Sequence, residues 1–233
     1  MAGNDIKLRS SEGSDFDCYL ALPDNGPAPA AIIVAAVTGV GPDMRAMADD
    51  LAANGIIAAA PDMFWRTDPG YIERSEETQP RIHARTQPRE EVINTGIQDV
   101  ADVSSHLKNL DACNGRVAVL GFCYGGPYAL IATARLGADA GCSYHGTSMA
   151  NYTNYLEGND KPLLIHWGSE DHAAPADVVT TYQDIAARMD NLKVHIFPGV
   201  KHGYMMTTAK AAYDPKAFRH SWDATLTLLK TLK

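Results

Sequence analysis

A cysteine flanked by glycines is the residue of this chain best suited to act as a nucleophile. Cys123 lies in the sequence GFCYGG, with Gly121 and Gly125 two residues to either side. The pattern G-x-C-x-G is typical of a nucleophile elbow, a sharp turn from a strand into a helix, with sulfur in place of the usual serine oxygen. We expect the strand and helix backbones to approach too closely there for side chains, so the flanks are glycine. A buried structural cysteine beside a glycine-rich turn is the alternative.

The sequence on both sides of the elbow agrees with this interpretation. Residues 116–120 form an apolar run that predicts a strand, and helical spacing follows the cysteine. Pro127 fits the first turn of that helix, because the N–H groups there have no partner within the helix. A helix that begins near Tyr124 points its positive end at Cys123, which favours the nucleophilic thiolate over the thiol.

A thiol nucleophile needs a base within reach and a third group that orients the base. In enzymes built on such an elbow, these partners follow in the order nucleophile, acid, histidine, in loops after later strands. Asp171 lies in GSEDHAAP after an expected strand at 163–167, and His202 lies in PGVKHGY after one at 193–197. We therefore predict a catalytic group of Cys123, Asp171 and His202. Loop capping is the alternative role for an isolated Asp or His.

Other histidines and one other acid fit these roles less well. His172 precedes the last strand, and His145 follows a strand as the immediate neighbour of the elbow. His166 lies inside an apolar strand, where a core histidine bonded to the backbone is the ordinary case. His83 lies in an irregular loop and is a candidate substrate contact. Glu170 is the rival acid.

Apolar runs alternate with helical patterns and predict a single α/β domain over residues 1–233. We expect strands at 18–22, 30–37, 56–60, 116–120, 141–144, 163–167 and 193–197, and helices at 43–54 and 90–110. The run AAIIVAAV at 30–37 is typical of a strand covered on both faces in a mostly parallel sheet. Residues 61–88 lack such a pattern, and long loops of this kind are either functional or solvated surface.

The composition excludes several kinds of partner. A net charge of −8 and a pI of about 5.4 argue against binding nucleic acid or an anionic membrane. No run approaches the roughly 18 apolar residues of a membrane span, and the N-terminal residues lack an apolar targeting segment. We expect a cytoplasmic protein that is a monomer or weak dimer. The four cysteines lie far apart, so free thiols are expected and no metal or cofactor is implied.

With these residues in place, the chain resembles the dienelactone hydrolase family of α/β-hydrolases. The similarity runs from about Cys18 to the C-terminus, through IIVAAVTGVGPDMR, AAAPDMFWR, VLGFCYGGPYAL, HWGSEDHAAP and FPGVKHGY. The resemblance implies the α/β-hydrolase fold and hydrolysis of enol lactones that bear a carboxylate, without metal or cofactor. It also implies that Cys123 is the nucleophile, that His202 is the base and acid, and that Asp171 orients His202.

The resemblance further implies an oxyanion hole and a substrate contact. The oxyanion hole would be the backbone N–H groups of Tyr124 and of Val37, the latter at the end of the first buried strand. Arg81 would bind the substrate carboxylate. Two positions depart from the family pattern, because family members carry a glutamate at the position of Ala36 and a second arginine at that of Met206.

These observations predict a hydrolase of a lactone or small carboxylic ester. Its substrate would be dienelactone or a less polar relative, because Met206 replaces an arginine. The acyl-enzyme would be a thioester of Cys123. A non-catalytic ligand-binding or thiol-sensing protein on the same fold is the alternative, because Ala36 removes the glutamate that helps activate the cysteine.

Overall fold

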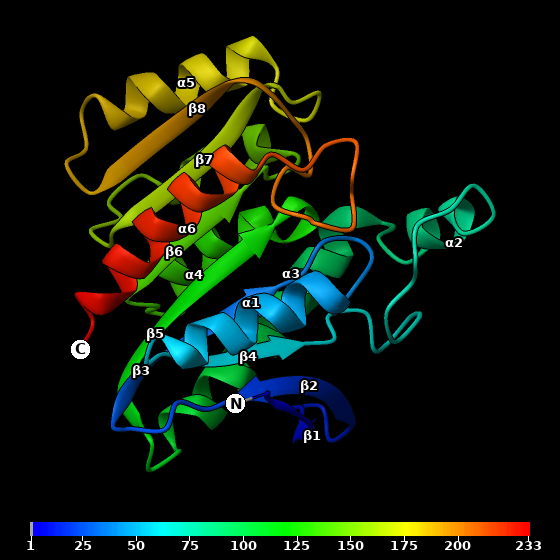
Figure 1. Cartoon of the computed structure of the whole chain (residues 1–233), viewed down its shortest axis with the longest axis vertical. Helices are drawn as coiled ribbons and strands as arrows, with labels where there is room; N and C mark the ends of the chain where they lie inside the picture. The colour runs from blue at the N-terminus through cyan, green and yellow to red at the C-terminus, as the bar shows by residue number, and fades with distance from the viewer. Residues whose placement is uncertain (1) are drawn as a thin grey trace. The chain divides into compact units, whose positions relative to one another are not determined.

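The computed structural model describes residues 2–233 (Figure 1). They divide into two compact units. The first unit ends at Val117 and also includes Lys233, and the second runs from Ala118 to Leu232. Our expectation of a single domain over residues 1–233 stays a prediction. Within residues 2–233, no helix combines the length and the apolar character that are needed to cross a bilayer.

The first unit contains strands in the order β1, β2, β4, β3. Its elements are β1 (Asn4–Arg9), β2 (Asp15–Ala21), β3 (Ala28–Val34), α1 (Pro42–Ala53), β4 (Ile57–Pro61), α2 (Gln79–Ala84) and α3 (Arg89–Lys108). β3 and β4 are parallel, whereas β2 is antiparallel to both β1 and β4. Every residue of β3 is buried, as its continuous apolar sequence predicts. α1 packs on β4 and β2, and α3 packs on β3 and β1.

The second unit begins within β5 (Cys113–Phe122) and has parallel strands in the order β5, β6, β7, β8. Its other elements are η1 (Cys123–Gly125), α4 (Gly126–Arg135), β6 (Ala140–Tyr144), η2 (Met149–Tyr155), β7 (Leu163–Glu170), α5 (Ala176–Ala186), β8 (Leu192–Lys201) and α6 (Pro215–Lys230). β6 is buried at every position, and both α4 and α6 pack on it. In Figure 1, α6 crosses this part of the sheet and α5 lies beside β8. All four strands therefore end at the same edge.

The structure confirms the mostly parallel α/β class, with most element ends shifted by a few residues. β1 was not expected, because NDIKLR is largely polar and exposed. The irregular stretch 61–88 contains the short helix α2. Our expectation that Val37 ends the first buried strand is wrong, because β3 ends at Val34 and Val37 lies in a turn. The N–H of Gly39 donates to the carbonyl of Ala36 (2.9 Å), and this tight turn diverts the chain early.

Candidate active site

Cys123 lies at the turn between β5 and α4 with a backbone φ of 53°. Few residues other than glycine adopt a positive φ, and such strain is concentrated at functional turns. A Cβ at Gly121 would lie 2.0 Å from the carbonyl oxygen of Gly125, so no side chain fits there. A Cβ at Gly126 would lie 2.5 Å from the Cα of Gly146, which is a second close approach that the sequence pattern did not identify. The elbow geometry thus depends on its glycines.

The helix after the elbow begins slightly later than the sequence predicts. Tyr124 follows Cys123 within the short 3-10 turn η1, and the α-helix α4 starts at Gly126. Pro127 occupies the first turn of α4, as expected. The amino end of α4 therefore follows the cysteine after one tight turn, and its dipole favours negative charge near that end.

His202 and Asp171 directly follow the strands β8 and β7. The Nε2 atom of His202 lies 3.2 Å from the Sγ atom of Cys123. The Nδ1 atom of His202 lies 2.9 and 3.1 Å from the two carboxylate oxygens of Asp171. Asp171 is only 4% exposed, and one of its oxygens also accepts a hydrogen bond from the N–H of Ala173 (2.8 Å). The three residues selected from the sequence are thus in hydrogen-bonding contact.

The surroundings of His202 favour its protonated form. Burial lowers its pKa, but the hydrogen bonds to Asp171 and Cys123 and the charges of both groups outweigh burial and raise the pKa to about 10. The imidazole is therefore an imidazolium at neutral pH. A positive charge 3.2 Å from the sulfur stabilises a thiolate, which is the form that attacks carbonyl carbons.

Two other cysteines have surroundings of the opposite kind. Burial raises the pKa of Cys18 and of Cys142 to about 12 in each case, so both remain thiols at neutral pH. A buried, inert structural role, which was the alternative for Cys123, fits Cys18 and Cys142 instead. Cys123 differs because it is 8% exposed and bonded to a charged histidine.

Comparison with known proteins agrees with this geometry. The model of the dienelactone hydrolase family matches residues 16–233. This chain belongs to the dienelactone hydrolase family. It is similar to carboxymethylenebutenolidase 1 of Cupriavidus pinatubonensis, with 27% identity over 233 residues that cover 100% of this chain and 99% of the relative. The carboxymethylenebutenolidase of Pseudomonas strain P51 is 25% identical, with coverage of 100% and 97%. The chain is a carboxylic ester hydrolase.

Solved structures with a similar fold cover nearly the whole of this chain. The dienelactone hydrolase of Anabaena variabilis superposes with a TM-score of 0.72 at 16% identity, covering 99% of each chain. The dienelactone hydrolase-like phosphotriesterase P91, from metagenomic libraries, gives a TM-score of 0.80 at 20% identity, with coverage of 100% and 99%. The α/β-hydrolase fold expected from the sequence is confirmed.

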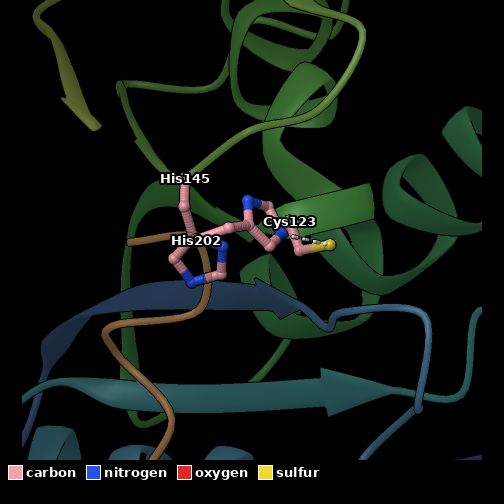
Figure 2. Close-up of side chains that lie close together, drawn as sticks. All are labelled: Cys123, His145 and His202. Atoms are coloured by element: carbon pink, nitrogen blue, oxygen red, sulfur yellow. Dashed lines mark hydrogen bonds between the residues drawn. The ribbon is translucent and has the colours of Figure 1, made fainter. Parts of the chain in front are cut away.

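His145, which we expected to fit the role of base less well than His202, also lies at the candidate site. It directly follows β6, has a φ of 40°, and donates its backbone N–H to the carbonyl of His166 (2.7 Å). Its ring lies edge-on to the ring of His202, with centroids 4.8 Å apart. Figure 2 shows the two rings side by side, with the sulfur of Cys123 next to that of His202. Burial and the charge of His202 lower the pKa of His145 well below its usual value. Its position after a parallel strand is the signal that also identified Asp171 and His202.

His166 is buried in β7 as expected, but it is not bonded to the backbone as we expected. Among residues 2–233, neither of its ring nitrogens has a hydrogen-bond partner. It is instead stacked between other rings, with centroids 5.4 Å from Tyr144 and 5.0 Å from His195. His172 is exposed, with its ring 5.0 Å from that of His202, and Glu170 is also exposed. Asp171 rather than Glu170 is thus the acid bonded to His202.

The arginine implied by the family resemblance lies in the first unit and is engaged there. Arg81 is exposed and forms a bidentate ion pair with Asp68. Arg85, four residues later, is 1% exposed and donates from Nη2 to the carbonyl of Gly70 (3.0 Å). Its guanidinium also lies over the ring of Phe64, 4.0 Å from the ring centre. Among the described residues, its Nε and Nη1 atoms have no hydrogen-bond partner. The sequence could not show which arginine of this stretch is buried.

Proposed function

We propose that this chain hydrolyses a lactone or small carboxylic ester through a Cys123–His202–Asp171 triad and a thioester acyl-enzyme. The observation that carries the proposal is the pair of contacts made by His202, with Nε2 3.2 Å from Sγ and Nδ1 2.9 Å from Asp171. This is the order of contacts that an activated nucleophile, its base and an orienting acid require.

The proposed reaction begins from the thiolate and imidazolium pair. The sulfur of Cys123 attacks the carbonyl carbon, and the carbonyl oxygen becomes an oxyanion. When the C–O bond to the leaving group breaks, Nε2 of His202 gives its proton to the departing alkoxide. The now neutral His202 then takes a proton from water, which attacks the thioester and releases the acid. Breaking of the C–S bond restores the thiolate, and His202 is again protonated.

The proposed oxyanion hole follows the family resemblance. The backbone N–H of Tyr124, the residue after the nucleophile, would supply one donor, and that of Val37 would supply the other. Removing one such donor typically costs about 10²–10³-fold in kcat, because the donors bind charge that develops only in the transition state.

The substrate is proposed to be dienelactone or a less polar lactone or ester. Met206 is half-buried and stands where the family pattern has an arginine. A charge-assisted hydrogen bond contributes about 1.5–3 kcal/mol, so its loss corresponds to binding a carboxylate roughly 10–150-fold more weakly. Arg81 is the anion contact that the resemblance implies.

The proposed mechanism is tested with p-nitrophenyl esters and a panel of lactones. We expect Cys123→Ala to abolish hydrolysis while the protein stays folded, and Cys123→Ser to keep little activity, because a hydroxyl ionises far less readily than a thiol. Cys113→Ser is the matched control, since it removes a half-buried thiol from the first unit and should leave turnover unchanged.

Rapid acid quench during turnover should trap an acyl group on the peptide that contains Cys123, as seen by mass spectrometry. Full activity of Cys123→Ala would overturn the nucleophile assignment. A burst equal to the enzyme concentration without turnover would instead favour a binding or thiol-sensing protein.

The proposed anion contact is tested by assaying Arg81→Ala on a carboxylate-bearing lactone and on its methyl ester. If Arg81 binds the carboxylate, the variant should raise KM for the acid at least about tenfold but not for the ester, because a charge-assisted hydrogen bond is lost. An unchanged KM for the acid would refute the contact.

A further inference from the structure

Cys123, His145 and His202 bring a thiolate sulfur and two imidazoles to one point of the second unit (Figure 2). One ligand atom from each residue lies within 4.8 Å of those of the other two. The residues follow β5, β6 and β8, so the common edge of these parallel strands is what gathers them. The proposed hydrolysis uses Cys123 and His202 but gives no role to the nitrogens of His145.

His145 has the properties of a ligand rather than of a hydrogen-bonding core residue. It is 1% exposed, and among residues 2–233 neither of its ring nitrogens has a hydrogen-bond partner. Leaving a buried polar atom without a partner is costly, so an arrangement that leaves both nitrogens in this state is unusual. A neutral imidazole always has one nitrogen with an available lone pair.

We propose that Cys123, His145 and His202 form a site for Zn²⁺ or another borderline divalent cation, and that the bound ion blocks hydrolysis. One thiolate and two imidazoles are ligands typical of zinc, which leaves the fourth position of a tetrahedron open to water or an anion. Zn–S and Zn–N bonds of about 2.3 and 2.0 Å place the ligand atoms of one sulfur and two nitrogens roughly 3.3–3.5 Å apart. The sulfur and Nε2 of His202 are already 3.2 Å apart. Because the three ligand atoms lie within 4.8 Å of one another, binding then requires the nitrogen of His145 to approach by up to about 1.5 Å.

The surroundings of the three ligands meet two further requirements. A metal-bound histidine usually donates its other N–H to a carboxylate, which fixes its tautomer. Nδ1 of His202 is bonded to Asp171 (2.9 Å), and this leaves Nε2 to face the sulfur and the ion. Access is also available, because the side chain of His202 is 16% exposed and Cys123 is 8% exposed. Asp171 and the thiolate supply the negative charge that offsets the cation.

The ion would inhibit because it binds the atoms that the proposed mechanism uses. The Cys123–His202 pair holds one proton between Sγ and Nε2, and a metal bonded to both atoms displaces that proton into solvent. Neutral His145 contributes only a lone pair, so one proton is released for each ion bound. The sulfur is then bonded to the ion, and Nε2 can no longer protonate a leaving group. The inhibition rests on the proposed function, but the binding of the ion does not.

The test measures metal binding and hydrolysis separately on the full chain. Co²⁺ is added to reduced protein without substrate, and the absorption spectrum is recorded. We expect one equivalent to bind, with a near-ultraviolet sulfur-to-cobalt band and the intense visible bands of a four-coordinate ion. Zn²⁺ should displace Co²⁺ and abolish these bands, should inhibit ester hydrolysis in the same concentration range, and should be removed by a chelator with return of activity.

Variants show whether His145 is a ligand. His145→Phe keeps a ring against Phe122 and removes both nitrogens, and we expect it to weaken the affinity for Zn²⁺ by at least about tenfold. His145→Asn is a second variant, because asparagine tolerates a positive φ better than phenylalanine does. His172→Ala is the matched control, since it removes an exposed histidine whose ring also lies 5.0 Å from that of His202. Its affinity for Zn²⁺ should equal that of the wild type.

Each outcome decides one proposal. If the wild type gives no sulfur-to-cobalt band, or if folded His145→Phe and His145→Asn bind Zn²⁺ as tightly as the wild type, the metal site is refuted. The band should also disappear in Cys123→Ser, and its persistence would refute the site too. If Co²⁺ binds as described but Cys123→Ala still hydrolyses esters, the metal site stands and the proposed catalytic role of Cys123 fails.

Discussion

His166 offers the clearest link between burial and stability in this protein. Its imidazole is fully buried in β7, stacked between Tyr144 and His195, and without a hydrogen-bond partner among the described residues. Burial is the main cause that lowers its pKa to about 3, with smaller contributions from the charges of His195 and His220. In the unfolded chain the same group has its ordinary pKa of 6.5. The native state therefore binds fewer protons than the unfolded state between these two values.

The sign of the effect follows from this difference. A histidine whose pKa is lowered by folding contributes fully to stability above pH 6.5, and that contribution is lost as the pH falls toward 3. Each unit of pKa difference corresponds to about 1.4 kcal/mol. The titration of His166 alone should therefore lower the free energy of unfolding by about 2 kcal/mol when the pH falls from 7 to 5. His166→Phe keeps the stacked ring and has nothing to titrate. It also removes unpartnered buried nitrogens, which cost about 1–3 kcal/mol.

We therefore expect His166→Phe to be more stable than the wild type by about 1–3 kcal/mol at pH 7, and the difference to grow by about 2 kcal/mol at pH 5. The measurement is urea unfolding of both proteins at the two pH values, followed by circular dichroism and tryptophan fluorescence. His83→Phe is the control, because this histidine is exposed and the change should stay within about 0.5 kcal/mol at both values. A difference between wild type and His166→Phe that does not change with pH would refute the reasoning.

Two further predictions concern the elbow and the orienting acid. Gly121→Ala should destabilise the protein and reduce hydrolysis, because its Cβ would lie 2.0 Å from the carbonyl oxygen of Gly125; wild-type melting and turnover would contradict the close approach. Asp171→Asn should lower kcat by about 10²–10⁴-fold in steady-state assays. The alkaline limb of the pH profile, expected near pH 10 where His202 loses its proton, should move to lower pH, because the carboxylate stabilises the imidazolium. An unmoved limb would assign it to another group.

The sequence by itself determined the class of fold and the three residues of the proposed triad. Apolar runs and helical spacing are local patterns, so the positions of β3, β6 and α3 could be predicted from short stretches. The G-x-C-x-G pattern indicates the elbow because a backbone turn of that kind excludes side chains at its flanks. Asp171 and His202 could be found because residues that follow parallel strands meet at one edge of a sheet.

Tertiary structure alone decided which polar side chains are buried and what they contact. The sequence could not show that Arg85 is buried while Arg81 pairs with Asp68, because four residues of separation do not reveal the packing of an irregular stretch. Nor could it show that His145 and His166 lack hydrogen-bond partners, since that depends on every neighbouring atom. Burial and pairing are properties of distant residues brought together by folding, and they set both the charge of His202 and the arrangement of ligands around Cys123.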